Sequence, residues 1–191
     1  MTAILAIKDS AGNIYMGSDT QVTCGQKQDH IVDGKVFAKD EMVIGCAGEL
    51  KYINYIQNRW FIPERSREYD CDMEYLCCSV VGSLEESLSS LGEWKPKGII
   101  LVAYRGELYS IGYDLSVMHI HDEVYAEGNG HEVAKGYAQG LLDGLGDDVD
   151  SDDYEGILHA AIRYTGDHVE GVGGIGPVLC MKTEIVEDTN D

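Results

Sequence analysis

The second residue of the chain is the first one whose type could do chemistry. If Met1 is removed, Thr2 becomes the N-terminus and its hydroxyl lies beside a free α-amine. The ordinary pKa of such an amine is about 7.7–8.0, so it can accept the hydroxyl proton near neutral pH and make the oxygen nucleophilic. Many proteins begin Met-Thr for no catalytic reason, so the interpretation of Thr2 depends on the rest of the sequence.

Asp19 and Lys35 are candidates for a charge pair that would assist such a nucleophile. They stand sixteen positions apart, and each lies at the expected end of a strand. A buried lysine tends to lose its proton unless a carboxylate beside it keeps it charged. A charged lysine near a hydroxyl favours the deprotonated form of that hydroxyl. The alternative interpretation is an ordinary surface pair at two strand ends.

Several further segments stand at element boundaries, and their order along the chain is informative. They are 17–23 (Gly-Ser-Asp-Thr-Gln-Val-Thr), Lys35-Val36, 44–48 (Ile-Gly-Cys-Ala-Gly), Gly128-Asn129-Gly130 and Gly166-Asp167. Together with Thr2 they resemble the proteasome β-subunit family, particularly the bacterial peptidase subunit of the HslV type. The resemblance runs from Thr2 to about Lys182.

The resemblance implies an N-terminal nucleophile (Ntn) hydrolase, an α+β fold with a four-layer αββα sandwich of two antiparallel sheets flanked by helix pairs. It implies a threonine-type endopeptidase subunit of a self-compartmentalising protease, assembled as a homo-oligomeric ring or barrel. A polypeptide substrate would reach it through an ATP-dependent unfoldase, and its chemistry needs no metal or organic cofactor. One domain is expected over residues 1–183, followed by a polar acidic tail over 184–191.

The resemblance also assigns roles to matching residues. Thr2 would be nucleophile and base, Lys35 would lower the pKa of the hydroxyl, and Asp19 would hold Lys35. The backbone N–H of Gly45 would form the oxyanion hole, although Gly45 and Gly48 could simply serve a tight strand-to-helix turn. The remaining assignments are Asn129 and Asp167 around the terminal amine, and Val22, Thr23 and Gly48 against the substrate.

Two departures from the family pattern concern proton transfer. The family usually has serine where this sequence has Asn129, and serine three residues after the aspartate where this sequence has Glu170. Asparagine can hydrogen-bond an amine, but it cannot accept and pass on a proton as a hydroxyl can. Two alternatives to a peptidase therefore stay open: a non-catalytic scaffold subunit, and an Ntn amidohydrolase that acts on a small amide.

The elements that must position these residues follow from the hydrophobic pattern. Helices and strands come in blocks, which favours antiparallel sheets covered by helices over a parallel βαβ sheet. The expected strands are 3–7, 14–18, 35–38, 42–47, 98–104, 107–112, 116–121, 124–127 and 178–183. The expected helices are about 50–60, 72–91, 130–145 and 152–168. The segment 20–34 is expected to be a loop.

Composition limits the partners. The chain has 14 basic and 34 acidic side chains in 191 residues, a net charge of −20, which disfavours nucleic acid and membrane surfaces as partners. The N-terminus lacks the pattern of a signal peptide, so a cytoplasmic location is expected. The six cysteines lack paired spacing and are expected to be mostly buried and reduced, with Cys77-Cys78 packed inside a helix. No metal site is expected, since His119 and His121 share a strand face without a third ligand.

Overall fold

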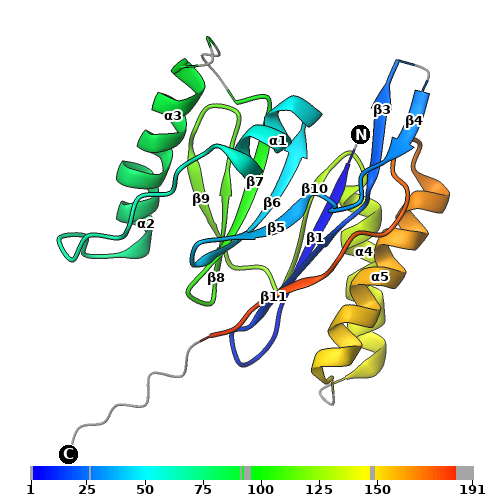
Figure 1. Ribbon diagram of the computed structural model, residues 1–191. Helices are drawn as coiled ribbons and strands as arrows, with labels where there is room; N and C mark the ends of the chain where they lie inside the picture. The colour runs from blue at the N-terminus through cyan, green and yellow to red at the C-terminus, as the bar shows by residue number, and fades with distance from the viewer. Residues whose placement is uncertain (1, 26, 91, 93–95, 147–148, 184–191) are drawn as a thin grey trace, which may run out of the picture.

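The computed structural model describes residues 2–25, 27–90, 92, 96–146 and 149–183. Met1 and the expected acidic tail 184–191 lie outside the described residues. Two antiparallel sheets form the centre of the molecule (Figure 1). The first has the strand order β10-β1-β2-β11, with β1 at Ala3–Lys8, β2 at Ile14–Ser18, β10 at Val124–Gly128 and β11 at Leu179–Met181.

The second sheet has the order β5-β6-β7-β8-β9, and every neighbouring pair is antiparallel. Short connections join β5 to β6, β7 to β8 and β8 to β9, whereas residues 49–97 and their helices connect β6 to β7. The strands are β5 (Val36–Lys39), β6 (Met42–Gly48), β7 (Gly98–Tyr104), β8 (Glu107–Ile111) and β9 (Val117–Ile120).

The segment 20–34, expected to be a loop, contains a hairpin instead. Strands β3 (Gln21–Cys24) and β4 (Lys27–His30) pair in a separate two-stranded sheet. All four residues of β4 are exposed, so the segment has no apolar alternation from which a strand could be predicted.

A shared apolar cluster joins the two large sheets. Ile4 and Met16 of the first sheet pack with Val43 and Leu101 of the second in one buried cluster. Strand β1 is buried along almost its whole length, which accounts for its continuous run Ala-Ile-Leu-Ala-Ile. The catalytic candidates Thr2, Asp19 and Lys35 stand at the ends of strands that this cluster fixes.

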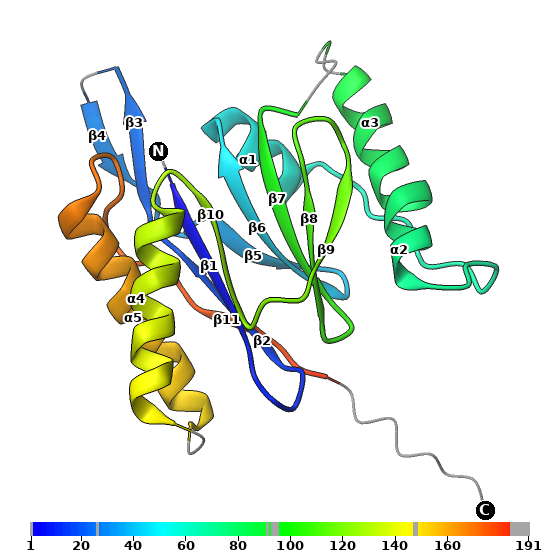
Figure 2. The same cartoon turned by 180° about the vertical axis from the view of Figure 1, so that it is seen from behind.

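Helices cover the outer face of each sheet (Figure 2). Helices α4 (His131–Leu145) and α5 (Ser151–His168) pack on the first sheet, and α5 begins with a capping box between Asp150 and Asp153. Helices α1 (Leu50–Asn58), α2 (Asp72–Tyr75) and α3 (Val81–Ser90) pack on the second sheet.

The helix expected over 72–91 is interrupted by one π-helical turn, η1, at Leu76–Val80. The expectation that Cys77-Cys78 is packed inside this helix was wrong, because both residues are exposed, as is Cys71. Leu76 and Val80 turn inward instead, so the two cysteines lie on the solvent side of the π turn. Cys46 is buried and Cys180 is half-buried, but with three of the described cysteines exposed the expectation that most cysteines are buried was wrong.

Candidate active site

Thr2 lies directly before β1 and is 5% exposed. The turn between β10 and α4 encloses it, since the Gly130 N–H donates a 3.3 Å hydrogen bond to the Thr2 carbonyl. Gly128 has a φ of +93°, and a Cβ added there would collide with the Thr2 carbonyl oxygen. Glycine at 128 therefore allows this turn to approach Thr2 closely.

Asp19 and Lys35 form a buried ion pair beside Thr2. The Lys35 Nζ lies 2.7 Å from an Asp19 carboxylate oxygen, and the two side chains are 1% and 0% exposed. Asp19 also accepts the backbone N–H of Ala3 at 3.0 Å and that of Gly173 at 3.3 Å. The surface-pair alternative therefore does not apply to these two residues.

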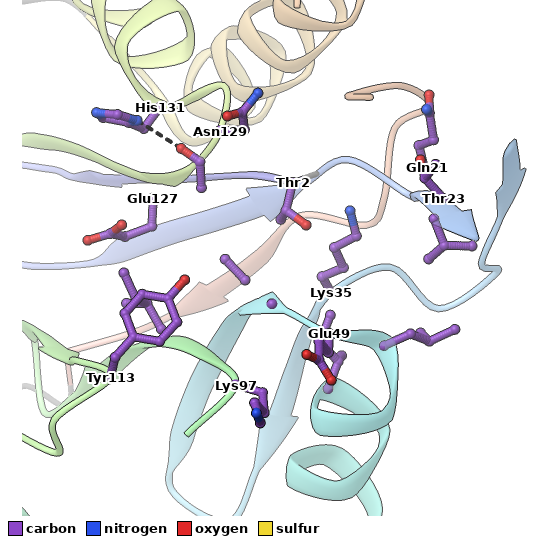
Figure 3. A pocket seen from close by; sticks show the side chains of 17 residues that line it. Thr2, Gln21, Thr23, Lys35, Glu49, Lys97, Tyr113, Glu127, Asn129 and His131 are labelled. Carbon is purple, nitrogen blue, oxygen red and sulfur yellow. Dashed lines mark hydrogen bonds between the residues drawn. The ribbon is translucent and has the colours of Figure 1, made fainter. Parts of the chain in front are cut away.

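Burial lowers the pKa of Lys35, while the charge of Asp19 and its hydrogen bond oppose that shift. The Asp19 carboxylate thus stabilises the charged form of the buried Lys35 ammonium group. Figure 3 shows the Thr2 hydroxyl and the Lys35 ammonium group pointing toward one another. The arrangement places a positive charge where an oxygen of Thr2 would have to ionise.

A cavity of about 710 Å³ opens over this group. The ends of both sheets and the β3 strand form its walls (Figure 3). The residues that line it are Thr2, Gln21, Val22, Thr23, Lys35, Ala47, Gly48, Glu49, Leu50, Ile53, Lys97, Ile99, Tyr113, Glu127, Gly128, Asn129 and His131.

Six of the nine candidate residues therefore line one cavity: Thr2, Val22, Thr23, Lys35, Gly48 and Asn129. Asp19 lies behind Lys35, to which it is bonded. Gly45 and Asp167 do not line the cavity.

Gly45 faces the interior between the two sheets. A Cβ added to it would lie 2.8 Å from both Ile4 Cγ2 and Met16 Sδ, so glycine is needed there for packing. Gly48 stands three residues later, at the strand end that borders the cavity. The Cys46 N–H donates to the Lys35 carbonyl, and alternate N–H groups of a strand point the same way. The Gly48 N–H is thus directed to the side on which Lys35 lies.

Asp167 lies in the last turn of α5 and is exposed, as is Glu170 after the helix. Thr165 is the helix residue that packs inward at this level, and two positions further along a helix turn a side chain by about 200°. Of the two positions that depart from the family pattern, Asn129 lines the cavity and Glu170 does not.

The sequence interpretation missed several lining residues. Glu127 and His131 flank the segment 128–130, and adjacency to that motif could have indicated them. The Glu127 carboxylate accepts the Tyr125 hydroxyl at 2.7 Å, and His131 Nδ1 lies 2.8 Å from the Gly128 carbonyl oxygen. Lys97 and Tyr113 carry no such signal, because only the pairing of β6, β7 and β8 brings them to this end of the sheet.

Within the described residues, no group of three or more histidine, cysteine, aspartate or glutamate side chains is placed to hold a metal ion. His119 instead bonds Glu107 at 3.1 Å and stacks on Tyr109. None of the described helices combines the length and hydropathy needed to cross a membrane.

No protein-family model matches the sequence, and no curated protein does. Solved structures do match it. BPH of Thiobacillus denitrificans in complex with epoxomicin has a TM-score of 0.72 at 15% identity, over 94% of this chain and 96% of that one. HslV of Trypanosoma brucei has a TM-score of 0.62 at 20% identity, over 93% and 98%. Anbu (ancestral beta-subunit) of Yersinia bercovieri has a TM-score of 0.63 at 16% identity, over 95% and 84%. The expected resemblance to HslV-type proteins is confirmed at the level of the fold.

Proposed function

We propose that this chain is a threonine peptidase of the proteasome-like Ntn-hydrolase type, with Thr2 as its nucleophile. The observation that carries the proposal is the fully buried Asp19–Lys35 pair behind the Thr2 hydroxyl. A buried ion pair is a poor source of stability, because desolvation of both charges offsets most of their attraction. A role in lowering the pKa of the hydroxyl accounts for its presence at this place.

The reaction requires the free α-amine of Thr2, so whatever precedes Thr2 must first be removed. Thr2 Oγ1 then attacks the carbonyl carbon of a peptide bond while the α-amine takes its proton. The C–N bond breaks as the amine returns that proton to the leaving nitrogen, and an ester to Thr2 remains. Water, activated by the same amine, hydrolyses the ester and restores Thr2. Lys35 stays protonated and stabilises the ionising oxygen.

In this proposal Gly48, and not Gly45, supplies the N–H that stabilises the oxyanion. Gly48 borders the cavity, and the alternation of the strand directs its N–H to the side of Lys35. Gly45 is buried against Ile4 and Met16 and cannot face a substrate. A fixed N–H at this position contributes about 3 kcal/mol to stabilisation of the transition state.

The substrate is a polypeptide in extended conformation. Val22 and Thr23 on β3 line one wall of the cavity, and Gly48 at the end of β6 lines another. A peptide between these two walls could pair with the backbone of either one, as an added strand does. Asn129 lines the same cavity as Thr2, and in this proposal it hydrogen-bonds the Thr2 amine, whereas Asp167 takes no part.

The proposal includes the assembly expected from the resemblance, a homo-oligomeric ring or barrel served by an ATP-dependent unfoldase. It also includes a single domain over 1–183 with αββα layering and chemistry that uses no cofactor. The apolar cluster between the two sheets and the helix clusters on their outer faces support this layering.

Intact mass spectrometry before and after exposure to epoxomicin, a peptide epoxyketone, tests the proposal. The epoxyketone requires a hydroxyl and a free α-amine on one residue. The proposal predicts a mass that begins at Thr2, one adduct per chain, and no adduct in Thr2→Ala. A mass that retains residues before Thr2, with no adduct, would overturn it.

A non-catalytic scaffold subunit is the second candidate. Two observations favour it: asparagine stands at 129 beside Thr2, and Asp167 is exposed outside the cavity. A scaffold would form the same assembly on sedimentation and would leave epoxomicin unreacted even when Thr2 is N-terminal.

A further inference from the structure

A second cavity, of about 780 Å³, lies at the far end of the five-stranded sheet. The β5–β6 turn with Asp40 and Glu41 lines it, together with the segment from Phe61 to Arg65 and the rings of Tyr75 and Tyr104. Strand β6 runs from this turn to Gly48, so its length separates the cavity from the Thr2 pocket by about 20 Å. Figure 1 shows the β5–β6 turn at the opposite end of the sheet from the N-terminus. We call this cavity the distal groove.

Phe61 is presented to solvent on a rigid segment. Its side chain is 71% exposed, although its neighbours Trp60 and Ile62 are buried at 1% and 6%. The Trp60 indole N–H donates to Ser83 Oγ at 3.0 Å, and the Pro63 carbonyl accepts the Tyr75 hydroxyl at 2.6 Å. The segment is thus anchored on both sides of Phe61, by the Trp60 side chain and by the Pro63 carbonyl.

The rim of the distal groove is acidic. Asp40, Glu41 and Glu64 are all exposed, and no ion pair of theirs occurs among the described residues. The nearby cations bond elsewhere: Arg65 Nε lies 3.1 Å from Asp72, and Lys39 Nζ donates to the Gln57 carbonyl at 3.1 Å. Among the residues that line the groove, three carboxylates therefore stand against one cation, Arg65, which is paired with Asp72.

The Tyr104 hydroxyl adds a polar group to the aromatic wall. Tyr104 is 2% exposed, and within the described part of the chain its hydroxyl has no hydrogen-bond partner. Its ring centroid lies 5.6 Å from that of Tyr75. The hydroxyl is not sealed from solvent, so a ligand N–H could replace water as its hydrogen-bond partner.

We propose that the distal groove binds a basic segment of a partner protein, with a lysine or arginine side chain seated between the aromatic wall and the acidic rim. Aromatic faces attract cations, and carboxylates at the rim strengthen that attraction. Arginine fits best, because its planar group can stack on Phe61 while it donates to a rim carboxylate and to the Tyr104 hydroxyl. An acidic chain also draws basic partners over longer distances.

The occupant is a different protein. The chain's own residues 184–191 carry four acidic side chains and no basic one, so they would be repelled by the rim. A second copy of this chain would bring a net charge of −20 to the same place. The proposal does not depend on the peptidase activity, since no residue of the Thr2 pocket takes part.

Fluorescence anisotropy of a labelled Gly-Arg-Leu-Arg-Gly peptide amide tests this proposal. The measurements use Thr2→Ala protein, so that the probe cannot be hydrolysed. The triple variant Asp40→Asn, Glu41→Gln and Glu64→Gln should weaken binding at least tenfold, and so should Phe61→Ala. Asp40 has a φ of +52°, a conformation that asparagine also tolerates, so the first substitution keeps the turn.

A matched triple variant controls for overall charge. Glu85→Gln, Glu86→Gln and Glu132→Gln remove the same three charges from exposed helix positions and should change binding less than twofold. Equal weakening by the two triple variants would overturn the proposal, because binding would then reflect net charge alone. Equal binding of a Gly-Gln-Leu-Gln-Gly peptide, or full binding by Phe61→Ala, would also overturn it. Circular dichroism of each variant checks that the fold is kept.

Discussion

The Lys35 ammonium lies 2.7 Å from the Asp19 carboxylate at the junction of the two sheets, and neither side chain reaches solvent. Asp19 directly follows β2 and Lys35 directly precedes β5, so the pair links both sheets. The carboxylate also holds the N–H of Ala3, the residue after the proposed nucleophile. One side chain thus positions both the cation and the strand that carries the hydroxyl.

The first prediction concerns this pair. Asp19→Asn should lower the free energy of unfolding by about 3–5 kcal/mol, because it leaves the Lys35 charge buried without a partner. The reaction with epoxomicin should be lost as well. In the double variant Asp19→Asn/Lys35→Met, most of the stability should return while the reaction stays absent. Urea unfolding and intact mass measure the two effects; a reactive double variant would contradict the proposed role of Lys35.

The two glycines of β6 should respond differently to alanine. A methyl group at Gly45 would meet Ile4 and Met16 at 2.8 Å, so Gly45→Ala should cost about 1–3 kcal/mol of stability and leave kcat for a fluorogenic peptide nearly unchanged. A methyl group at Gly48 would collide with the Lys97 carbonyl and displace the strand end. Gly48→Ala should therefore lower kcat by about 100–1000-fold. If Gly45→Ala lowered kcat and Gly48→Ala did not, Gly45 would be the residue whose N–H stabilises the oxyanion.

Asn129→Ser should raise kcat. A serine hydroxyl can accept and donate a proton beside the Thr2 amine, which the asparagine amide cannot do. We expect a gain of about tenfold, less than the ~100-fold that a fully positioned acid–base group contributes. Asn129→Ala is the control, and it should show no gain. Equal rates for the serine and alanine variants would mean that residue 129 takes no part in proton transfer.

Alkaline pH should destabilise the fold through its buried tyrosines. Burial raises the pKa of Tyr109 to about 12, above its ordinary value of 10.0, and that of Tyr15 likewise to about 12. Between these values the unfolded chain has released the phenolic protons and the folded chain has not, so the free energy of unfolding falls as pH rises from 10 to 12. Urea titrations across this range should show the fall, and Tyr109→Phe should make it shallower. An unchanged slope in Tyr109→Phe would contradict the assignment.

Most of the fold could be predicted from periodicity, because its strands and helices bury regular apolar faces. The strand at 14–18 and the helix at 152–168 agree with β2 and α5 to within one residue. The β3–β4 hairpin could not be predicted in this way, since β4 is exposed on both faces. The π turn at Leu76–Val80 also leaves no mark in the pattern, because it only shifts which residues face inward.

The site residues that the sequence predicts best are those that stand at the end of a strand. Thr2, Asp19 and Lys35 were identified by their order along the chain, and the structure brings them together. Gly45 and Gly48 differ by three positions in one strand, so they point to opposite sides of it. A resemblance of sequence motifs does not determine which way each glycine faces. It also does not determine the position of Asp167, which the turn of α5 directs away from the cavity.

The hydrogen bonds that hold Thr2 in place have a consequence for the order of events during maturation. They are made by the Thr2 carbonyl, which accepts from Gly130, and by the Ala3 amide, which donates to Asp19. Neither involves the nitrogen of Thr2, so the strand can dock before that nitrogen is released. Under the proposed function, the chain can therefore fold while its nucleophile is still blocked. Liberation of the amine would then be a step separate from folding, so the proposed peptidase could acquire its activity after its strands are in place.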